Sequence, residues 1–455
     1  MNFPTYHNIV EEPPFHEWPC SIWSPKDTAL QMLRRQARRR LVNAARTYTA
    51  HLSTVAGADT PDGNGALQVP DGDPDSCPIV MTGHQPVIFH AGLTYKYQKT
   101  QIFIREHSAI GIAVVIDTDE GDAGEFSCPV SEEDLSHRHT DQNLLERMQH
   151  LTTRRFSFAT GNSLFVACRR RSSSEIQQIS DVVLKNLRDC HCHRAVDAFQ
   201  RFSDLYGRLQ NPSMSEVNLI VRRAAGIGDQ LMEVRLSEIG RLPESIQFFA
   251  SLLRQPFSYA RRYNEVLARF RATHRIRNQA NPFPDLIVNP EECELPFWIV
   301  NLRTGTRSIP VVRRIAGVPA LCGDDGLVVE LLPGHEAAAL FSLSIAQTPL
   351  IPRGPLITAT MRLLFRDLFV HGIGGGHYDR FTDELIESWW NESASPLAVA
   401  SASRYLFDAE RSELDRLEQL AGRQRDLQFN PQGAMGSGIF PPGLEDVLCE
   451  LITEK

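Results

Sequence analysis

The sequence predicts an α/β protein built on a parallel sheet, and three observations lead to this class. An apolar run, a loop, a helical stretch and a second apolar run follow one another over residues 78–116, in the order of one βαβ unit. Loops rich in glycine and histidine follow apolar runs both early and late in the chain. Hydrophobic residues make up 42% and charged residues 22%, as in an ordinary globular protein with a sizeable core.

The 455 residues exceed one ordinary domain, so we expect a core with accessory parts. In chain order these are an N-terminal arm, helix and linker (1–76), the first half of the core (77–131), a mostly helical connecting insertion (132–281), the second half of the core (282–400) and a short C-terminal helical segment (401–455).

Charge and composition argue against several classes of function. A net charge of -8 is unlike that of a dedicated nucleic-acid binder. The chain has neither a secretory signal pattern nor a run of about 18 apolar residues. Nine scattered cysteines are typical of reduced thiols, and Cys190-His191-Cys192-His193 has no second ligand pair, so we expect no metal site there. We expect a cytoplasmic protein that binds a small molecule rather than nucleic acid or a membrane.

Five arginines crowd the first predicted helix, residues 26–52. A solvated face with acidic neighbours is the favoured interpretation, and phosphate binding is the alternative. The arginines are Arg34, Arg35, Arg38, Arg39 and Arg40.

The first candidate site is the loop that follows the apolar run 78–82. Free backbone N–H groups at the start of the next helix, together with the helix dipole, favour an anion. Histidines in such a loop can donate hydrogen bonds to phosphate or act as acid or base. We expect His84 and His90 to be catalytic, and the binding residues to be Thr82, Gly83, Gln85, Gly92 and Lys96.

A second candidate is the acidic turn 117–122, directly after the apolar run 110–116. Its four carboxylates can hold Mg²⁺, orient a ribose or accept an amine proton, and a solvated acidic turn is the alternative. We expect Asp117 and Asp119 to be catalytic, because alternate residues leaving a strand point the same way.

A third candidate is the glycine-rich loop at residues 371–379. Glycines allow the backbone to approach a ligand closely, and their N–H groups form an anion nest, although a plain flexible turn is the alternative. The spacing is not that of the dinucleotide fingerprint. Arg353, in a Pro-Arg-Gly-Pro segment, can bind a carboxylate or phosphate. The expected binding residues are Arg353, His371, Gly372, Gly374, Gly375, His377, Tyr378 and Asp379.

These loops resemble those of the bacillithiol-biosynthesis cysteine-adding enzyme family and related uncharacterised bacterial proteins. Thr82-Gly83-His84-Gln85-Pro86, with Phe89 and Gly92, is similar to a Thr-Gly-Gln-Gln-Pro loop of that family. The acidic turn is similar to its Glu-Asp-His-Asp turn. Pro352-Arg353 and the late glycines before Tyr378 are similar to its Pro-Arg and Gly-Gly-Pro-Gly-Glu elements. The resemblance extends in order over residues 78–395.

The resemblance implies a Rossmann-like core of the nucleotidyltransferase (HUP) type, shared with class I aminoacyl-tRNA synthetases, with connecting helices and a C-terminal coiled coil. The reaction proposed for the family joins cysteine to the amino group of a glucosaminyl-malate. In place of a long coiled coil, this chain has one predicted helix at 405–427, followed by Pro and Gly residues. That helix can pack on a partner, so a homodimer is one expectation.

Residues and resemblance together lead us to expect a ligase-like enzyme that joins an amino acid such as cysteine, or another carboxylate, to the amine of a small, sugar-derived substrate. ATP and Mg²⁺ are the candidate cofactors. The two loop histidines would stabilise phosphate charge, Lys96 and Arg353 would hold anionic groups, and an acidic-turn carboxylate would bind metal or accept the amine proton. Two alternatives stay open: a nucleotidyltransferase acting on a small phosphate or sugar, and a non-catalytic ligand-binding protein of the same fold.

Overall fold

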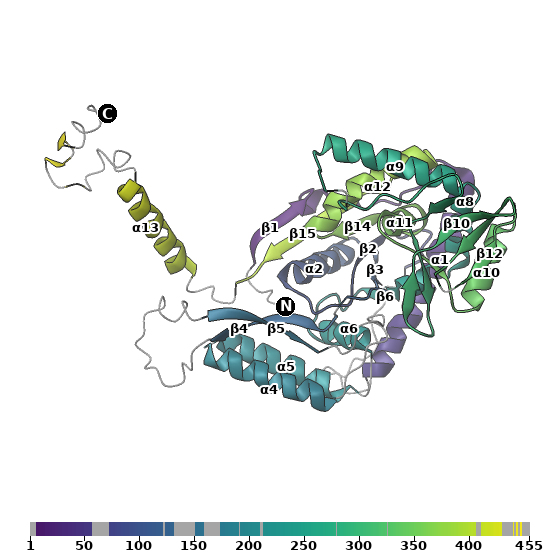
Figure 1. The fold of residues 1–455 in the computed structure, drawn as a ribbon. Coiled ribbons are helices and arrows are strands. Elements are labelled where there is room, and N and C mark those ends of the chain that lie inside the picture. Colours follow the sequence, from purple (N-terminus) through teal and green to yellow (C-terminus); the bar gives the residue numbers. More distant parts are fainter. Residues whose placement is uncertain are drawn as a thin grey trace.

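The computed structural model has a mixed α/β architecture with a mainly parallel sheet, which confirms the predicted class (Figure 1). No helix among the described residues combines the length and apolar character needed to cross a bilayer. The structure describes residues 6–56, 72–121, 123–131, 151–158, 173–190, 192–209, 213–278, 280–324, 326–405, 411–429, 440, 443, 444, 446 and 447.

A six-stranded sheet forms the centre of the molecule. Five of its strands are parallel, and β1 pairs antiparallel with β15 at one edge. We count the five parallel strands along the chain, beginning with β2. Read from the edge opposite β1, they lie in the order third, second, first, fourth, fifth. The order across the sheet is β1 (His7–Glu12), β15 (Leu397–Ser403), β14 (Leu368–His371), β2 (Ile79–His84), β3 (Ile110–Val115) and β6 (Met232–Arg235).

The apolar strands of this sheet are covered on both faces. Every residue of β3 is buried, as expected for a central parallel strand. Because side chains alternate along a strand, Met81 and Ile112 join one apolar cluster, whereas Val80 and Ala113 join another. Helices α1 (Thr28–Ala56), α8 (Pro243–Leu253) and α12 (Ile373–Trp390) contribute to the first cluster, and α2 (Ala91–Glu106) to the second.

The segment expected to be a helical insertion also contains β6, a strand of the central sheet. Within this segment the sequence also predicts a strand near Leu164–Cys168, and those residues lie outside the described part of the chain. Helices α4 and α5 pack with the two-stranded sheet of β4 and β5 (Figure 1). The elements here are β4 (Glu125–Ser131), β5 (Leu151–Ser157), α4 (Ser173–Asp189), α5 (His193–Arg208), α6 (Met214–Ala224), α7 (Leu236–Ile239) and α9 (Pro256–Thr273).

The expected second half of the core begins instead with two small antiparallel sheets, and the central sheet resumes only at β14. One sheet consists of β12 (Val328–Glu330), β11 (Val318–Cys322), β10 (Val311–Ile315) and β7 (Glu292–Glu294). The other consists of β13 (Leu350–Pro352), β8 (Phe297–Asn301) and β9 (Thr306–Ser308). The remaining elements are a 3₁₀ turn (Phe15–Glu17), α10 (Glu336–Ile345), α11 (Pro355–Thr360), a π-helical turn (Met361–Phe365) and α13 (Arg411–Phe429), which projects from the body in Figure 1.

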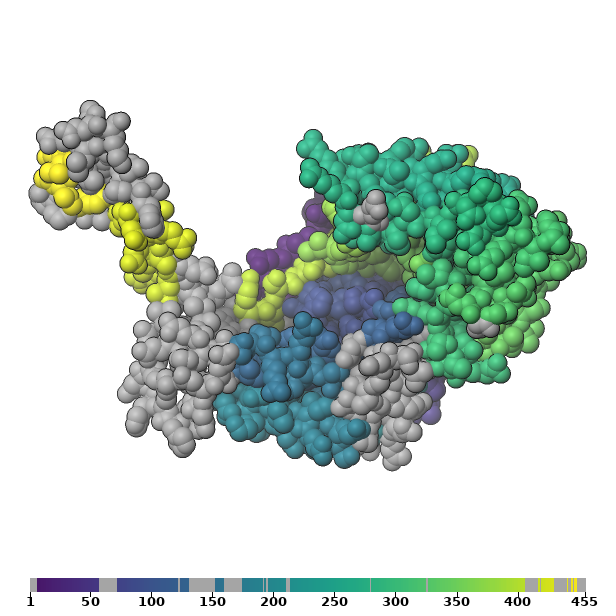
Figure 2. All heavy atoms as spheres, viewed as in Figure 1, coloured from purple at the N-terminus to yellow at the C-terminus, as the bar shows by residue number. Residues whose placement is uncertain are grey.

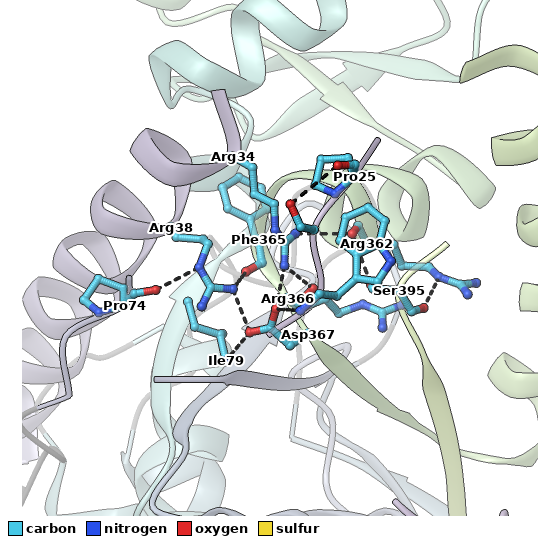
Figure 3. Close-up of polar contacts among 12 residues, drawn as sticks. Pro25, Arg34, Arg38, Pro74, Ile79, Arg362, Phe365, Arg366, Asp367 and Ser395 are labelled. Atoms are coloured by element: carbon cyan, nitrogen blue, oxygen red, sulfur yellow. Dashed lines mark hydrogen bonds and ion pairs between the residues drawn. The ribbon is translucent and has the colours of Figure 1, made fainter. Parts of the chain in front are cut away.

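Two arginines of α1 are buried, so the expectation of a solvated face is wrong for them (Figure 3). Arg34 and Arg38 donate to the two carboxylate oxygens of Asp367, the residue before β14, at 2.8 and 2.7 Å. The same carboxylate accepts the backbone N–H groups of Ile79, at 2.7 Å, and Trp23, at 2.9 Å. This Asp367 hub fastens α1, β2 and β14 together at the amino edge of the sheet.

Candidate functional site

The candidate site lies where the chain reverses its direction of progress across the sheet, between β2 and β14. These strands pair in parallel, with Val370 opposite Thr82, so both end at the same edge. The Thr82 hydroxyl also donates to the Val370 carbonyl at 2.9 Å. From this edge the chain continues into α2 and α12, which pack on opposite faces of the sheet. Open α/β sheets bind ligands in the crevice that such a reversal creates.

Four side chains at this edge form what we call the switch-point cluster: His84, His90, Lys96 and His371. Burial lowers the pKa of each histidine, and the nearby Lys96 ammonium lowers all three further. His84 is additionally affected by the charge of His90. The structure therefore brings together, within electrostatic reach, residues from two loops that are nearly 300 positions apart. Figure 2 shows the surface hollowed between the α9–α12 part and the α4–α5 part, with α2, the helix that carries Lys96, in the floor.

Lys96 is the most unusual member of the cluster. It is 2% exposed, and its Nζ donates to the Gly83 carbonyl at 2.8 Å. No carboxylate in the described part of the chain forms an ion pair with it. Burial lowers its pKa to about 7, because a charged amine is poorly solvated there. A buried amine without a counter-ion is a suitable place for an anionic ligand.

Hydrogen bonds set the tautomers of the two loop histidines in opposite ways. Nδ1 of His84 lies 3.1 Å from the Gln85 carbonyl, to which it must donate, so Nε2 of His84 is an acceptor. Nδ1 of His90 instead accepts the Gly92 N–H at 3.1 Å and caps α2, so Nε2 of His90 is a donor. Burial, with the Lys96 charge, lowers the pKa of His84 to about 4, so the neutral ring prevails at neutral pH.

Two glycines of this loop are required by close neighbours. A Cβ atom at Gly83 would lie 2.7 Å from the backbone oxygen of Val114 in β3. A Cβ atom at Gly92 would lie 2.7 Å from Ser401 Oγ in β15. Both glycines therefore allow the loop to lie close against the sheet, whether or not they also contact a ligand.

A buried asparagine holds the loop in place. Asn218, in α6, donates from its amide nitrogen to the carbonyl oxygens of Pro86, at 2.6 Å, and Ala123, at 2.7 Å. It thus joins the loop after β2 to the turn after β3. The sequence pattern gave no sign of this residue beyond one amide within an apolar helix.

The acidic turn divides into a buried and an exposed part. Asp117 is buried and accepts the backbone N–H of Ser237 at 3.0 Å and its hydroxyl, which fixes the start of α7. This structural contact competes with the catalytic role expected for Asp117. Asp119 and Glu120 each lie 3.5 Å from Arg307, and Asp119 is close enough to His84 to raise its pKa. Asp122 lies outside the described residues.

The described carboxylates of this turn, Asp117, Asp119 and Glu120, have other partners than a metal ion. Among the described residues there is no group of three or more His, Cys, Asp or Glu side chains arranged to hold a metal ion. Asp117 faces a helix start and Asp119 faces an arginine. The carboxylates that the structure describes in this turn therefore offer no Mg²⁺ site by themselves.

The late glycine loop contributes unevenly to the site. Nε2 of His371 donates to Oδ2 of Asp379 at 3.2 Å, and Asp379 is buried. Gly372 caps α12, and a Cβ atom at Gly372 or Gly374 would meet open space, whereas one at Gly375 would lie 2.7 Å from His371 Nδ1. His377 is exposed, and Tyr378 packs near Phe283, with ring centroids 6.0 Å apart. We find no interaction of either residue with the switch-point cluster among the described contacts.

Arg353 lies in a different group of side chains. It forms an ion pair with Glu294, and its guanidinium lies 4.9 Å from the centre of the Trp298 ring. Arg307 lies 4.3 Å from the centre of the same ring and donates to the Thr118 carbonyl at 2.9 Å. The expected anion contact of Arg353 therefore competes with an internal carboxylate. Arg307, which links this group to the acidic turn, was not singled out by the sequence.

Comparison of the chain with protein-family models and with curated proteins gives no match in either case.

Proposed function

We propose that this chain is a cytoplasmic, ligase-like enzyme that uses a nucleoside triphosphate to activate a carboxylate and transfers the acyl group to the amine of a small molecule. The observation that carries the proposal is the switch-point cluster, in which three imidazoles and a buried amine, unpaired with any carboxylate that the structure describes, meet at the starts of two helices. Such a place favours phosphate groups, because helix N-termini and the ammonium group both attract negative charge.

We further infer that the central sheet is a Rossmann-like core of the nucleotidyltransferase type. Its strand order and the reversal between β2 and β14 support this inference, because nucleotides bind at such positions in doubly wound folds. No step of the reaction is assigned to Mg²⁺ held by the protein. The resemblance of the loops to a family that joins cysteine to a sugar amine favours an amino acid as the carboxylate.

The first step is nucleotidyl transfer to the carboxylate. A carboxylate oxygen attacks the α-phosphorus, a new O–P bond forms, and the bond to pyrophosphate breaks with its electron pair. Lys96, as an ammonium, and the Nε2 donor of His90 hydrogen-bond to oxygens that gain negative charge in this step. The arrival of the anion favours the charged form of Lys96, so binding and protonation support one another.

In the second step the amine attacks the acyl carbon and a C–N bond forms. The acyl–oxygen bond breaks, and the nucleoside monophosphate leaves with the electron pair. The proton lost by the amine requires an acceptor at the site.

The experiment is exchange of labelled pyrophosphate into ATP, with a mixture of amino acids as candidate carboxylates. We expect exchange with the wild type and a loss of about 10²-fold or more in His90→Ala and Lys96→Met, because each removes a donor to the developing charge. His335→Gln, a change of an exposed histidine at the start of α10, serves as the matched control. Exchange that is equal in all four proteins contradicts the assigned site.

Nucleotidyl transfer to a small phosphate or sugar is the second candidate, because the same cluster suits any attack on an α-phosphate. Product analysis separates the two. An amide together with free nucleoside monophosphate indicates ligation, whereas a nucleotide retained on the acceptor indicates nucleotidyl transfer. Binding of ATP without any turnover indicates a non-catalytic binding protein.

A further inference from the structure

Behind the switch-point cluster, charged side chains form a buried chain that ends at His371. Oδ2 of Asp379 accepts Nε2–H of His371 at 3.2 Å and Nη1–H of Arg362 at 3.0 Å. Asp379 and Arg362 are each 2% exposed. Arg362 is held in turn by Asp383, at 2.5 Å, and by the Ser395 carbonyl, at 3.0 Å. Its position is therefore fixed on three sides.

This chain decides which nitrogen of His371 can accept a proton. An ionised carboxylate only accepts hydrogen bonds, so Nε2 of His371 must carry the hydrogen and Nδ1 must present its lone pair. Nδ1 has no hydrogen-bond partner among the described residues, and it lies beside Gly375 in the first turn of α12. His371 thus keeps an acceptor nitrogen, unused by the described residues, beside the first turn of α12.

The surrounding charges keep both members of the pair in the required state. Burial alone raises the pKa of Asp379, but Arg362 and His371 outweigh it and leave the pKa below its usual value. Burial lowers the pKa of His371, while Asp379 opposes this and Arg366 and Lys96 add to it. At pH 7 the Asp379 carboxylate is therefore ionised and the His371 imidazole is neutral. These are the states required of an orienting partner and of a general base, respectively.

We infer that His371 is the general base of the second step, with Asp379 and Arg362 as positioning residues that hold its ring and tautomer. This inference rests on the proposed function. When the amine nitrogen bonds to the acyl carbon, its proton moves to Nδ1 of His371, and the acyl–oxygen bond breaks to release the nucleoside monophosphate. His84 also presents an acceptor nitrogen, but no carboxylate in the described part of the chain lies within hydrogen-bonding distance to orient it.

The test measures the two steps separately in the full chain. Pyrophosphate exchange with ATP and mixed amino acids reports the first step, and amide formation with glucosamine as the amine probe reports the second. In His371→Gln we expect amide formation to fall about 10²-fold or more, with exchange within about threefold of wild type. His335→Gln should change neither rate.

Asp379→Asn tests positioning through the pH dependence of amide formation, which a purely structural role of Asp379 would leave unchanged. Since Asp379 raises the pKa of His371, its loss should shift the acidic limb of the amide-formation rate to lower pH, in addition to slowing the reaction. The double variant should be no slower than His371→Gln, because the two residues act as one unit. If Asp379→Asn does not fold, His371→Gln still decides, because it leaves the Asp379–Arg362 pair in place.

The outcomes separate the two proposals. Absence of exchange in the wild type overturns the proposed function and this inference with it. Exchange in the wild type, together with unchanged amide formation in His371→Gln, overturns this inference alone. An equal loss of both rates in His371→Gln also overturns it, because His371 would then serve nucleotide binding rather than proton transfer.

Discussion

The two ends of β14 differ in how their charges are paired. At the amino end, Asp367 is surrounded by two arginines and two backbone N–H groups, so its carboxylate has partners on both oxygens (Figure 3). At the carboxyl end, Lys96 has one backbone carbonyl and no carboxylate among the described residues. Removing one partner from a fully paired buried charge group destabilises the fold strongly, whereas a buried charge without a counter-ion itself lowers stability and is suited to a ligand. The difference supports a structural role for the amino end and motivates the proposed functional role of the carboxyl end.

The largest effect is expected at the structural end. Asp367→Asn leaves Arg34 and Arg38 buried without their counter-charge, so the free energy of unfolding should fall by about 3–5 kcal/mol. Urea denaturation followed by circular dichroism measures this. The matched control is Asp75→Asn, which breaks a more exposed pair with Arg39 on the same helix and should cost far less. Similar losses in both variants would mean that the Asp367 hub is not a special support of the fold.

The opposite response is expected at the functional end. Lys96→Met removes a desolvated amine, so the free energy of unfolding should stay the same or rise, whereas pyrophosphate binding should weaken by about 30-fold. Isothermal titration calorimetry and urea denaturation measure the two quantities. A protein that is destabilised by this change, yet binds pyrophosphate as before, would place Lys96 with the structural charges.

The pH dependence sharpens the comparison further. Burial lowers the pKa of Lys96 to about 7 in the free protein, and a bound anion raises it, so binding takes up a proton. Below pH 7 the amine is already charged, so Lys96 adds no further pH dependence beyond the titration of pyrophosphate itself. Above pH 7 the Kd of pyrophosphate should rise by up to about tenfold per pH unit, and Lys96→Met should lack this dependence. A pH-independent Kd in the wild type contradicts the assignment.

The smallest effect is expected where the acidic turn meets the cluster. Asp119 raises the pKa of His84, so Asp119→Asn should lower that pKa further, with a stability change below about 1 kcal/mol. A histidine titration followed by NMR measures the shift. Glu120→Gln is the matched control, because Glu120 lies at the same 3.5 Å from Arg307 but is more exposed. Equal shifts of the His84 pKa in both variants would show that the turn acts on His84 only through its total negative charge, with no specific effect of Asp119.

Features with a local origin could be predicted from the sequence. The βαβ unit is observed as β2, α2 and β3, close to the expected bounds, because apolar periodicity and a glycine-containing loop specify each element without distant partners. The glycine- and histidine-containing loops also occur where apolar runs end. His84 and His371 were found in this way, since a strand end followed by a helix start is a pattern of neighbouring residues.

Features that depend on distant partners could not be predicted. Four-residue β6 belongs to the central sheet only because β3 offers it a place there, and its own length gives too weak a signal. The burial of Arg34 is decided by Asp367, 333 positions away in the chain. The commitment of Asp117 to α7 is decided by Ser237, 120 positions away. An arginine or aspartate has the same sequence signature whether its partner is water or a buried opposite charge.

By itself, then, the sequence determined the class of fold, the order of the βαβ unit and the loops at which chemistry is to be sought, because these follow from local periodicity. The tertiary structure decided which charges meet: it paired Arg34 with Asp367, joined His371 to Asp379 and placed no described carboxylate in an ion pair with Lys96. Burial makes the difference, since a charge removed from water must either find a partner within a few ångströms or change its pKa, and only the packed chain fixes those distances.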